Sequence, residues 1–197
     1  MKKSILLPIL TIVVMAALVL GLTLGTAGLA AKNAQAEHLK MMQTLLPGSE
    51  TFTLEPYDGQ DDNIRSVHKG ETGFVIETAT RGYAGDIVML IGVSKDGKVT
   101  GLTIRDMQET AGLGLRAMWD EQFLAQFLNT SGGVAIGTAG EDAFSGATGS
   151  DTADTDTYVD GISGATVTSK AIARCVNSAV GYVTGADVES GATSWGG

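Results

Sequence analysis

The chain begins with a long apolar stretch, which holds no charged residue from Ser4 to Ala31. About 20 helical residues cross a hydrocarbon layer of roughly 30 Å, so this stretch is long enough to span a membrane. A cleaved signal peptide is the competing interpretation, because the basic start and the small residues near Ala34 also fit one. The apolar core of a signal peptide is usually much shorter, so we favour an uncleaved transmembrane helix.

Two-residue periodicity follows in the middle of the chain. Hydrophobic and polar residues alternate from Thr72 to Thr80, and further strand-like runs cover 86–94 and 98–106. An Asp-Gly pair, ending at Gly97, separates the last two runs and supplies the positive φ that a tight turn needs. The pattern therefore predicts an antiparallel sheet with a hairpin at this pair.

Apolar residues at three- and four-residue steps predict two amphipathic helices. The first runs to about Leu128, and Trp119 and Phe123 are expected in the core because they lie on its stripe. Cys175 lies on the second stripe and is expected to behave as a small core hydrophobe. The first stripe comprises Leu115, Met118, Trp119, Phe123 and Phe127, and the second comprises Ala171, Ile172, Cys175, Val176, Ala179, Val180 and Val183.

These elements predict an α+β fold, with one N-terminal transmembrane helix followed by a single domain of antiparallel sheet and packed helices. Residues 32–42 continue the first helix until Pro47 ends it. Residues 131–157 are rich in Gly, Ser, Thr and Ala, which is typical of a surface loop. The expected segments are an anchor at 1–31, a stalk at 32–50, a domain at 51–185 with a flexible loop at about 131–157, and a flexible tail at 186–197.

The charge distribution separates the anchor from an acidic remainder. Two of the 13 Lys and Arg residues precede the apolar stretch and all 22 acidic residues follow it, so the net charge of −9 divides into +2 and −11. No basic patch is present, which argues against nucleic-acid binding. Lys2 and Lys3 against Lys32 and Lys40 give a slight positive-inside bias that points the domain outward.

The few cysteines and histidines limit the possible chemistry. Cys175 is the only cysteine, so an intramolecular disulfide, a CxxC pair and a thiolate metal cluster are excluded. The two histidines, His38 and His68, are expected to be solvated loop residues, because the sequence offers no cluster of further metal ligands beside them.

Candidate chemistry lies in residues 160–170, immediately before the second amphipathic helix. Hydroxyl side chains and glycines gather there, and free backbone N–H groups at a helix start favour an anion. Gly164 and Ala165 leave room for the backbone to approach a phosphate. The alternative is that Thr166, Thr168 or Ser169 simply caps the helix.

Three motifs in this order resemble a known family. Residues 160–166 match the flavinylation pattern Asp-x-x-Ser-Gly-Ala-Thr, while 81–85 enter the hairpin and 109–114 follow it. Together they resemble the G subunit of the Rnf ferredoxin:NAD oxidoreductase and, more distantly, the C subunit of the sodium-pumping NADH:quinone oxidoreductase. The resemblance covers nearly the whole chain, although Ala111 stands where the family usually has Pro.

The resemblance implies a single FMN-binding domain, in which the FMN phosphate is esterified to Thr166. The pattern recurs at Thr148 and Thr193, but an apolar helical stripe follows only Thr166. Leu113 is expected to contact the flavin ring and Thr110 to hydrogen-bond near it, although an ordinary turn with Leu113 in the core is the alternative. Lys170 and Arg174 lie on the helix that starts at the phosphate and could assist it, although solvated positions are the favoured alternative for both. The remaining expected cofactor-binding residues are Asp160, Ser163, Gly164, Ala165, Thr168, Ser169, Glu109, Gly112 and Gly114.

The implied function is an electron-relay subunit of a membrane redox complex that exports sodium or protons. Such a chain works with the other subunits, needs a flavin transferase for maturation, and turns over no diffusible substrate by itself. It would be joined to the cytoplasmic membrane by one helix, with its domain on the outer side. The alternatives are an anchored FMN flavoprotein of another respiratory or regulatory system, and a non-redox binding module.

Overall fold

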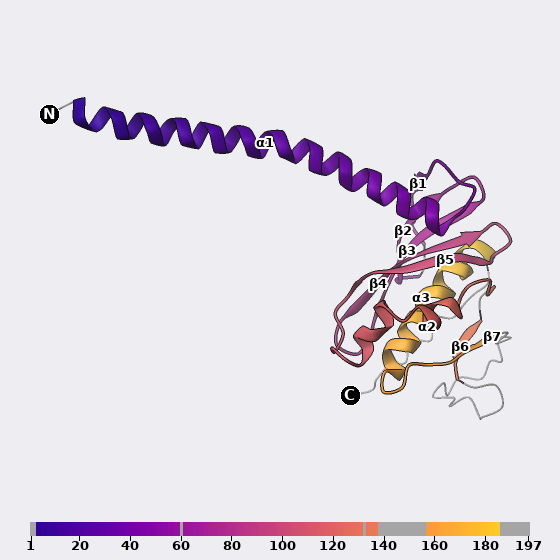
Figure 1. Ribbon diagram of the computed structural model, residues 1–197. Coiled ribbons are helices and arrows are strands. Elements are labelled where there is room, and N and C mark those ends of the chain that lie inside the picture. The colour runs from indigo at the N-terminus through magenta and orange to yellow at the C-terminus, as the bar shows by residue number, and fades with distance from the viewer. Residues whose placement is uncertain (1–2, 60, 132, 138–156, 186–197) are drawn as a thin grey trace. The chain divides into compact units, whose positions relative to one another are not determined.

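The computed structural model describes residues 3–59, 61–131, 133–137 and 157–185, in two compact units, Met1–Met41 and Met42–Gly197 (Figure 1). Thr148, Thr193, the tail and most of the expected loop at 131–157 lie outside the described residues.

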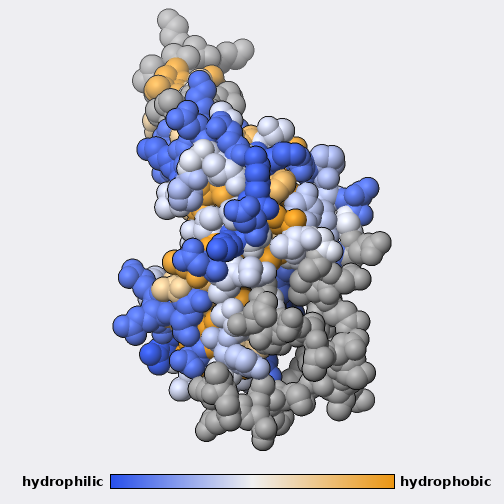
Figure 2. Space-filling model, turned by 90° about the vertical axis from the view of Figure 1, so that its right-hand side faces the viewer, coloured by the Kyte–Doolittle hydropathy of each residue, from blue (hydrophilic) through white to orange (hydrophobic). Residues whose placement is uncertain are grey.

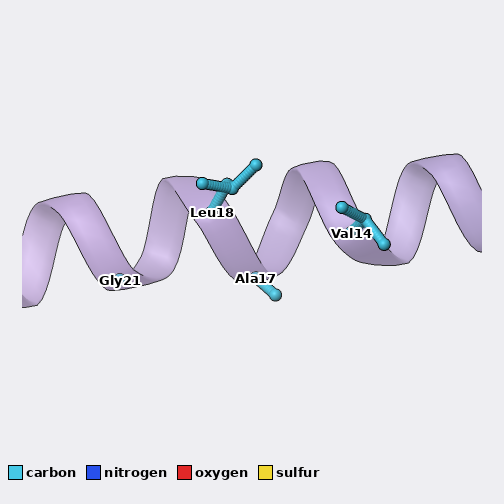
Figure 3. Close-up of a pocket in the computed structure, with 4 residues that line it drawn as sticks. All are labelled: Val14, Ala17, Leu18 and Gly21. Atoms are coloured by element: carbon cyan, nitrogen blue, oxygen red, sulfur yellow. The ribbon is translucent and has the colours of Figure 1, made fainter.

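The first unit consists of most of the helix α1, Lys3–Leu45. Of the expected anchor, side chains are described only for residues 12–18 and 21. Figure 3 shows Val14, Ala17, Leu18 and Gly21 lining one shallow surface of α1, at the three- and four-residue steps that share a helix face. Among the residues that the structure describes, none of the helices has the length and hydrophobicity needed to cross a membrane.

The second unit is built on a five-stranded antiparallel sheet in which the strands follow one another in chain order. The strands are β1 Thr53–Glu55, β2 Ile64–Lys69, β3 Gly73–Arg81, β4 Asp86–Ser94 and β5 Val99–Met107. The hairpin expected at Gly97 is confirmed, because Gly97 has φ +76° and its N–H donates to the Ser94 carbonyl at 2.9 Å. The three predicted strands agree with β3, β4 and β5 to within one residue at each end.

One face of this sheet is covered by the helix α3, Thr166–Thr184, which contacts β3 and β4 (Figure 1). The predicted apolar stripe is buried in that interface from Ala171 to Val180, and Val183 is half-buried. Cys175 is part of the stripe, and burial raises the pKa of its thiol, so it is an inert core residue as predicted.

The opposite face is covered by the end of α1. Met42, Leu45 and Leu46 pack against Val75 and Leu90, which alternate with strand residues that face α3. Gly92 and Gly101 are paired across β4 and β5, and a side chain on either would collide with the Leu45 backbone. The helix ends as expected, since the Leu46 N–H donates to Met42 O at 2.9 Å and Pro47 follows.

The helix expected up to Leu128 is wrong as a single element. A 3₁₀ helix, η1, covers Gly114–Met118, and a short helix, α2, covers Glu121–Ala125. Asp120 separates them, because its carboxylate accepts the Phe123 N–H at 3.0 Å and caps α2. Trp119 lies at the break and is 69% exposed, so its expected burial is also wrong, whereas Phe123 is buried as predicted.

Two further expectations need correction. The strands β6, Val134–Ile136, and β7, Thr157–Val159, form a parallel pair at the ends of the expected loop at 131–157. The side-chain amide of Asn177 pairs with both main-chain groups of Val134, which fixes β6 to α3. His38 and His68 are in α1 and β2, not in loops.

Hydrophilic residues predominate on the face shown in Figure 2, with hydrophobic residues in small patches between them.

Candidate functional site

The loop that leads into α3 is held by a closed set of hydrogen bonds. The Ile162 N–H donates to Ser169 Oγ at 3.0 Å, and that hydroxyl donates to the Ala165 carbonyl at 3.0 Å. The Ala165 N–H in turn donates to Ile162 O at 2.9 Å. Ser169 is fully buried, so the hydroxyl fixes the loop from inside. Gly164 completes the turn with φ +77°, a conformation that suits glycine.

The first turn of α3 keeps its backbone donors available. Ala165 is the N-cap residue and makes no side-chain capping bond. Within the described part of the chain, no acceptor contacts the N–H groups of Thr166, Val167 or Thr168. None of the three candidate hydroxyls therefore caps the helix, and the exposed side chain of Thr166 lies beside free donors. Free N–H groups and the positive end of the helix dipole favour an anion here.

The 109–114 loop brings an apolar side chain to this helix start. Thr110 O accepts the N–H groups of Leu113 and Leu115, each at 3.2 Å, which closes a tight turn. Leu113 is 47% exposed, so the alternative that placed it in the core is wrong. Its Cδ2 lies against Gly164, where a Cβ atom would be 3.3 Å away.

A carboxylate joins three segments around the site. Glu109 Oε2 accepts from Thr168 Oγ1 at 3.1 Å, and Glu109 Oε1 accepts from the Ala84 N–H at 3.2 Å. The 109–114 loop, α3 and the β3–β4 turn therefore meet at Glu109. Gly114 is buried between Thr168 and Glu109, where a side chain would collide with both. The Thr168 hydroxyl therefore links α3 to the 109–114 loop.

The β3–β4 turn is fixed in the same way. The Gly82 N–H donates to Gly85 O at 2.8 Å, and Arg81 forms an exposed ion pair with Asp86 at 3.3 Å. Arg174 of α3 donates to the Arg81 carbonyl at 3.0 Å, so its guanidinium holds the turn. The sequence predicts for Arg174 only a solvated position or a role at the phosphate, so this contact with the turn is an addition from the structure.

The remaining predicted residues are at the surface or at the edge of this arrangement. Ser163, Thr110 and Gly112 are exposed, and Lys170 is half-buried. Asp160 is also exposed, but its main chain is paired with the side-chain amide of Gln126. Gln126 was missed by sequence analysis, because a single polar residue near a helix end carries no signal of its partner.

The arrangement can hold an anion at the start of α3 and a flat apolar group against Leu113. Exposed Thr166 Oγ1 offers a nucleophile at the same place. Residues 109–114 and 160–170 thus form one candidate site.

Comparison with known proteins places the whole site inside one matched segment. The sequence profile of the FMN-binding domain family matches residues 82–181. The chain is 32% identical over 199 residues to the G subunit of the ion-translocating oxidoreductase complex of Methanosarcina acetivorans, covering 93% of this chain and 96% of that protein. It is 31% identical over 144 residues to the G subunit of the proton-translocating ferredoxin:NAD(+) oxidoreductase complex of Clostridium ljungdahlii, covering 73% and 70%.

A further relative is the G subunit of the Na(+)-translocating ferredoxin:NAD(+) oxidoreductase complex of Acetobacterium woodii, 34% identical over 131 residues. That match covers 64% of this chain but only 54% of the Acetobacterium protein. Among solved structures, the C subunit of the Na(+)-translocating NADH-quinone reductase of Parabacteroides distasonis has a TM-score of 0.47 and 22% identity, covering 68% of this chain and 76% of that one.

We expect the two serines of the site to differ in their effect on stability. Ser169→Ala removes the buried hydroxyl and leaves the Ile162 N–H without an acceptor, which should lower the free energy of unfolding by about 1–3 kcal/mol. Ser163→Ala changes an exposed side chain and should stay within about 0.5 kcal/mol of the parent. Urea unfolding followed by circular dichroism measures both, and equal midpoints for the two variants would contradict the buried role of Ser169.

Proposed function

Because the chain belongs to the FMN-binding domain family and is related to the G subunits of Rnf-type ion-translocating oxidoreductases, we propose that it relays electrons on an FMN covalently attached to Thr166. The observation that carries this proposal is the exposed Thr166 side chain at an uncapped helix start. The residues of the site fit the cofactor, because free N–H groups suit its phosphate and Leu113 suits its ring.

Attachment requires one phosphoryl transfer and no change of oxidation state. Thr166 Oγ1 forms a bond to the flavin phosphorus and loses its proton, while the bond from phosphorus to a leaving group breaks. The donor must therefore be an activated flavin, such as a flavin adenine dinucleotide that releases AMP, and a flavin transferase would bring it to Thr166. The N–H groups of Thr166 and Val167 are in place to stabilise the charge on the phosphoryl oxygens.

The bound group would supply the redox chemistry, since a phosphoester leaves the flavin ring unmodified and able to accept and pass on one or two electrons. Leu113 would shield one part of that ring from water. Glu109 keeps the 109–114 loop against α3 through its bonds to Thr168 and Ala84. The chain itself binds no diffusible substrate in this scheme.

Partners and placement follow from the same proposal. The electron donor and acceptor are neighbouring subunits of a membrane complex, and ion export of sodium or protons occurs elsewhere in that complex. The uncharged stretch from Ser4 to Ala31 would anchor the chain in the cytoplasmic membrane, with the domain outside. Support for the anchor comes from the length of this stretch, and support for the orientation comes from Lys2 and Lys3.

Thr166→Val should abolish covalent flavin while leaving the domain folded. Valine matches threonine in shape, and little stability should be lost because Thr166 caps nothing in the structure. Flavin fluorescence of the denatured gel band, after coexpression with a flavin transferase, should disappear. Thr148→Val and Thr193→Val are the controls and should retain it. Flavin found on a peptide containing Thr148 or Thr193 in the Thr166→Val chain would contradict the assignment.

Leu113→Asp should change the properties of the flavin but not its attachment. Reduction adds negative charge to the ring, so a carboxylate beside it should lower the midpoint potential. A charge interaction of about 1–2 kcal/mol corresponds to roughly 20–40 mV for a two-electron couple. Leu54→Asp, at an exposed position in β1, is the matched control. Redox titration that gives identical potentials for Leu113→Asp and the control would exclude the contact.

Cysteine labelling in intact cells should report an outer domain and an inner N-terminus. Glu71→Cys introduces a thiol at an exposed turn between β2 and β3, and it should react with a membrane-impermeant maleimide. Ser4→Cys should remain unlabelled until the membrane is opened. The native thiol contributes no background, because Cys175 is buried and its pKa is raised by that burial. The reverse pattern, or a soluble product beginning near Lys32, would refute the anchored topology.

A further inference from the structure

We propose that Gln126 is a positioning residue for flavin attachment, and that it acts by clamping the main chain of Asp160 at the entrance of the Thr166 loop. The proposal rests on the attachment of FMN to Thr166 proposed above. It assigns a role to a side chain that belongs to none of the three sequence motifs.

The clamp consists of one side-chain amide and one main-chain residue. Gln126 Oε1 accepts the Asp160 N–H at 2.9 Å, and Gln126 Nε2 donates to Asp160 O at 3.4 Å. The first bond has an ordinary length and the second is long, so the bond accepted by Gln126 Oε1 is the stronger of the two. The two residues are 34 positions apart in the chain, so the clamp ties the α2 segment to the loop.

Within the part of the chain that the structure describes, Gln126 alone hydrogen-bonds the main chain of Asp160. β7 ends at Val159, and the hydrogen bonds with Ser169 begin at Ile162. Gly161 contributes no side chain, and its backbone lies so near Ile136 that a Cβ atom would be 2.7 Å from it. The exposed carboxylate of Asp160 makes no hydrogen bond to the described part of the chain. The entrance of the loop at Asp160 therefore depends on Gln126, whereas the bonds with Ser169 hold the loop from Ile162 onward.

Gln126 is itself held on a fixed base. It follows α2 directly, and its N–H donates to the carbonyls of Phe123 and Leu124. The side chains of Phe123 and Phe127 are buried in the core, with ring centroids 5.3 Å apart. Asp120 caps the other end of the helix. A rigid base of this kind suits a group that must hold a loop in one place.

Positioning matters because attachment demands alignment of two reacting atoms. Thr166 Oγ1 must approach the phosphorus in line with the departing group, and displacement by about 1 Å can reduce such a rate strongly. Releasing Asp160 would free the entrance of the loop, upstream of the bonds with Ser169, and only a fraction of the resulting conformations would present the loop correctly to the transferase. The clamp keeps the loop in the productive path.

The test compares two substitutions of Gln126 in the full chain, incubated in detergent with purified flavin transferase and flavin adenine dinucleotide. Gln126→Met keeps the side-chain volume and removes both hydrogen bonds, and it should slow flavin attachment by roughly three- to tenfold. Gln126→Glu keeps an acceptor for the Asp160 N–H and should recover a rate between that of the Met variant and the parent. Gln122→Met is the matched control, because Gln122 is an exposed residue of α2; this variant should react at the parental rate.

Hydrogen exchange of the Asp160 amide provides a readout that needs no flavin. Exchange should accelerate in Gln126→Met and return toward the parent in Gln126→Glu, while the amides of α3 keep their protection. A parental attachment rate in Gln126→Met despite fast Asp160 exchange would overturn the positioning role, as would unchanged exchange. Failure of the parent itself to accept flavin would instead refute the proposed function, and the exchange data would still report on the clamp.

Discussion

The N–H groups at the start of α3, which have no acceptor among the described residues, are the feature on which the rest of the site depends. A helix start usually recruits a nearby hydroxyl as its cap. Here two of the three candidate hydroxyls are used elsewhere, because Ser169 bonds to Ile162 and Ala165 while Thr168 bonds to Glu109. The third, on Thr166, forms no capping bond. The donors consequently remain available for an anion, and the side chain at Thr166 remains exposed.

The sheet holds α3 in place, because the helix packs against β3 and β4. Side chains of β3 and β4 alternate between the two faces, so one face buries the apolar stripe of α3 and the other receives the end of α1. Loops at 81–86 and 109–114 leave the strands near the helix start and are joined there by Glu109. Burial of apolar surface thus determines where the helix lies, and a few hydrogen bonds determine what its exposed end presents.

The sequence predicted the parts of the fold that depend on local patterns. Two-residue alternation, the Asp-Gly turn and the α3 stripe each have a strong local signal, and all three are confirmed. The helix expected up to Leu128 failed because its apolar spacing is the same on both sides of Asp120, whereas the capping bond of that residue breaks the helix. Trp119 was misplaced for the same reason.

Within the site, the motifs identified the segments 109–114 and 160–170, but they could not show which contacts each residue makes. Thr166, Thr168 and Ser169 are chemically similar residues. In the structure Thr166 is exposed, whereas Thr168 and Ser169 are buried and hydrogen-bonded. Gln126 had no signal, because its partner is 34 positions away. Attachment of FMN to Thr166 can be tested by intact-mass measurement of the denatured chain, coexpressed with a flavin transferase, followed by peptide mapping. We expect the addition of one FMN with loss of water, located on the peptide that contains Thr166; an unmodified mass, or flavin on another peptide, would contradict the assignment.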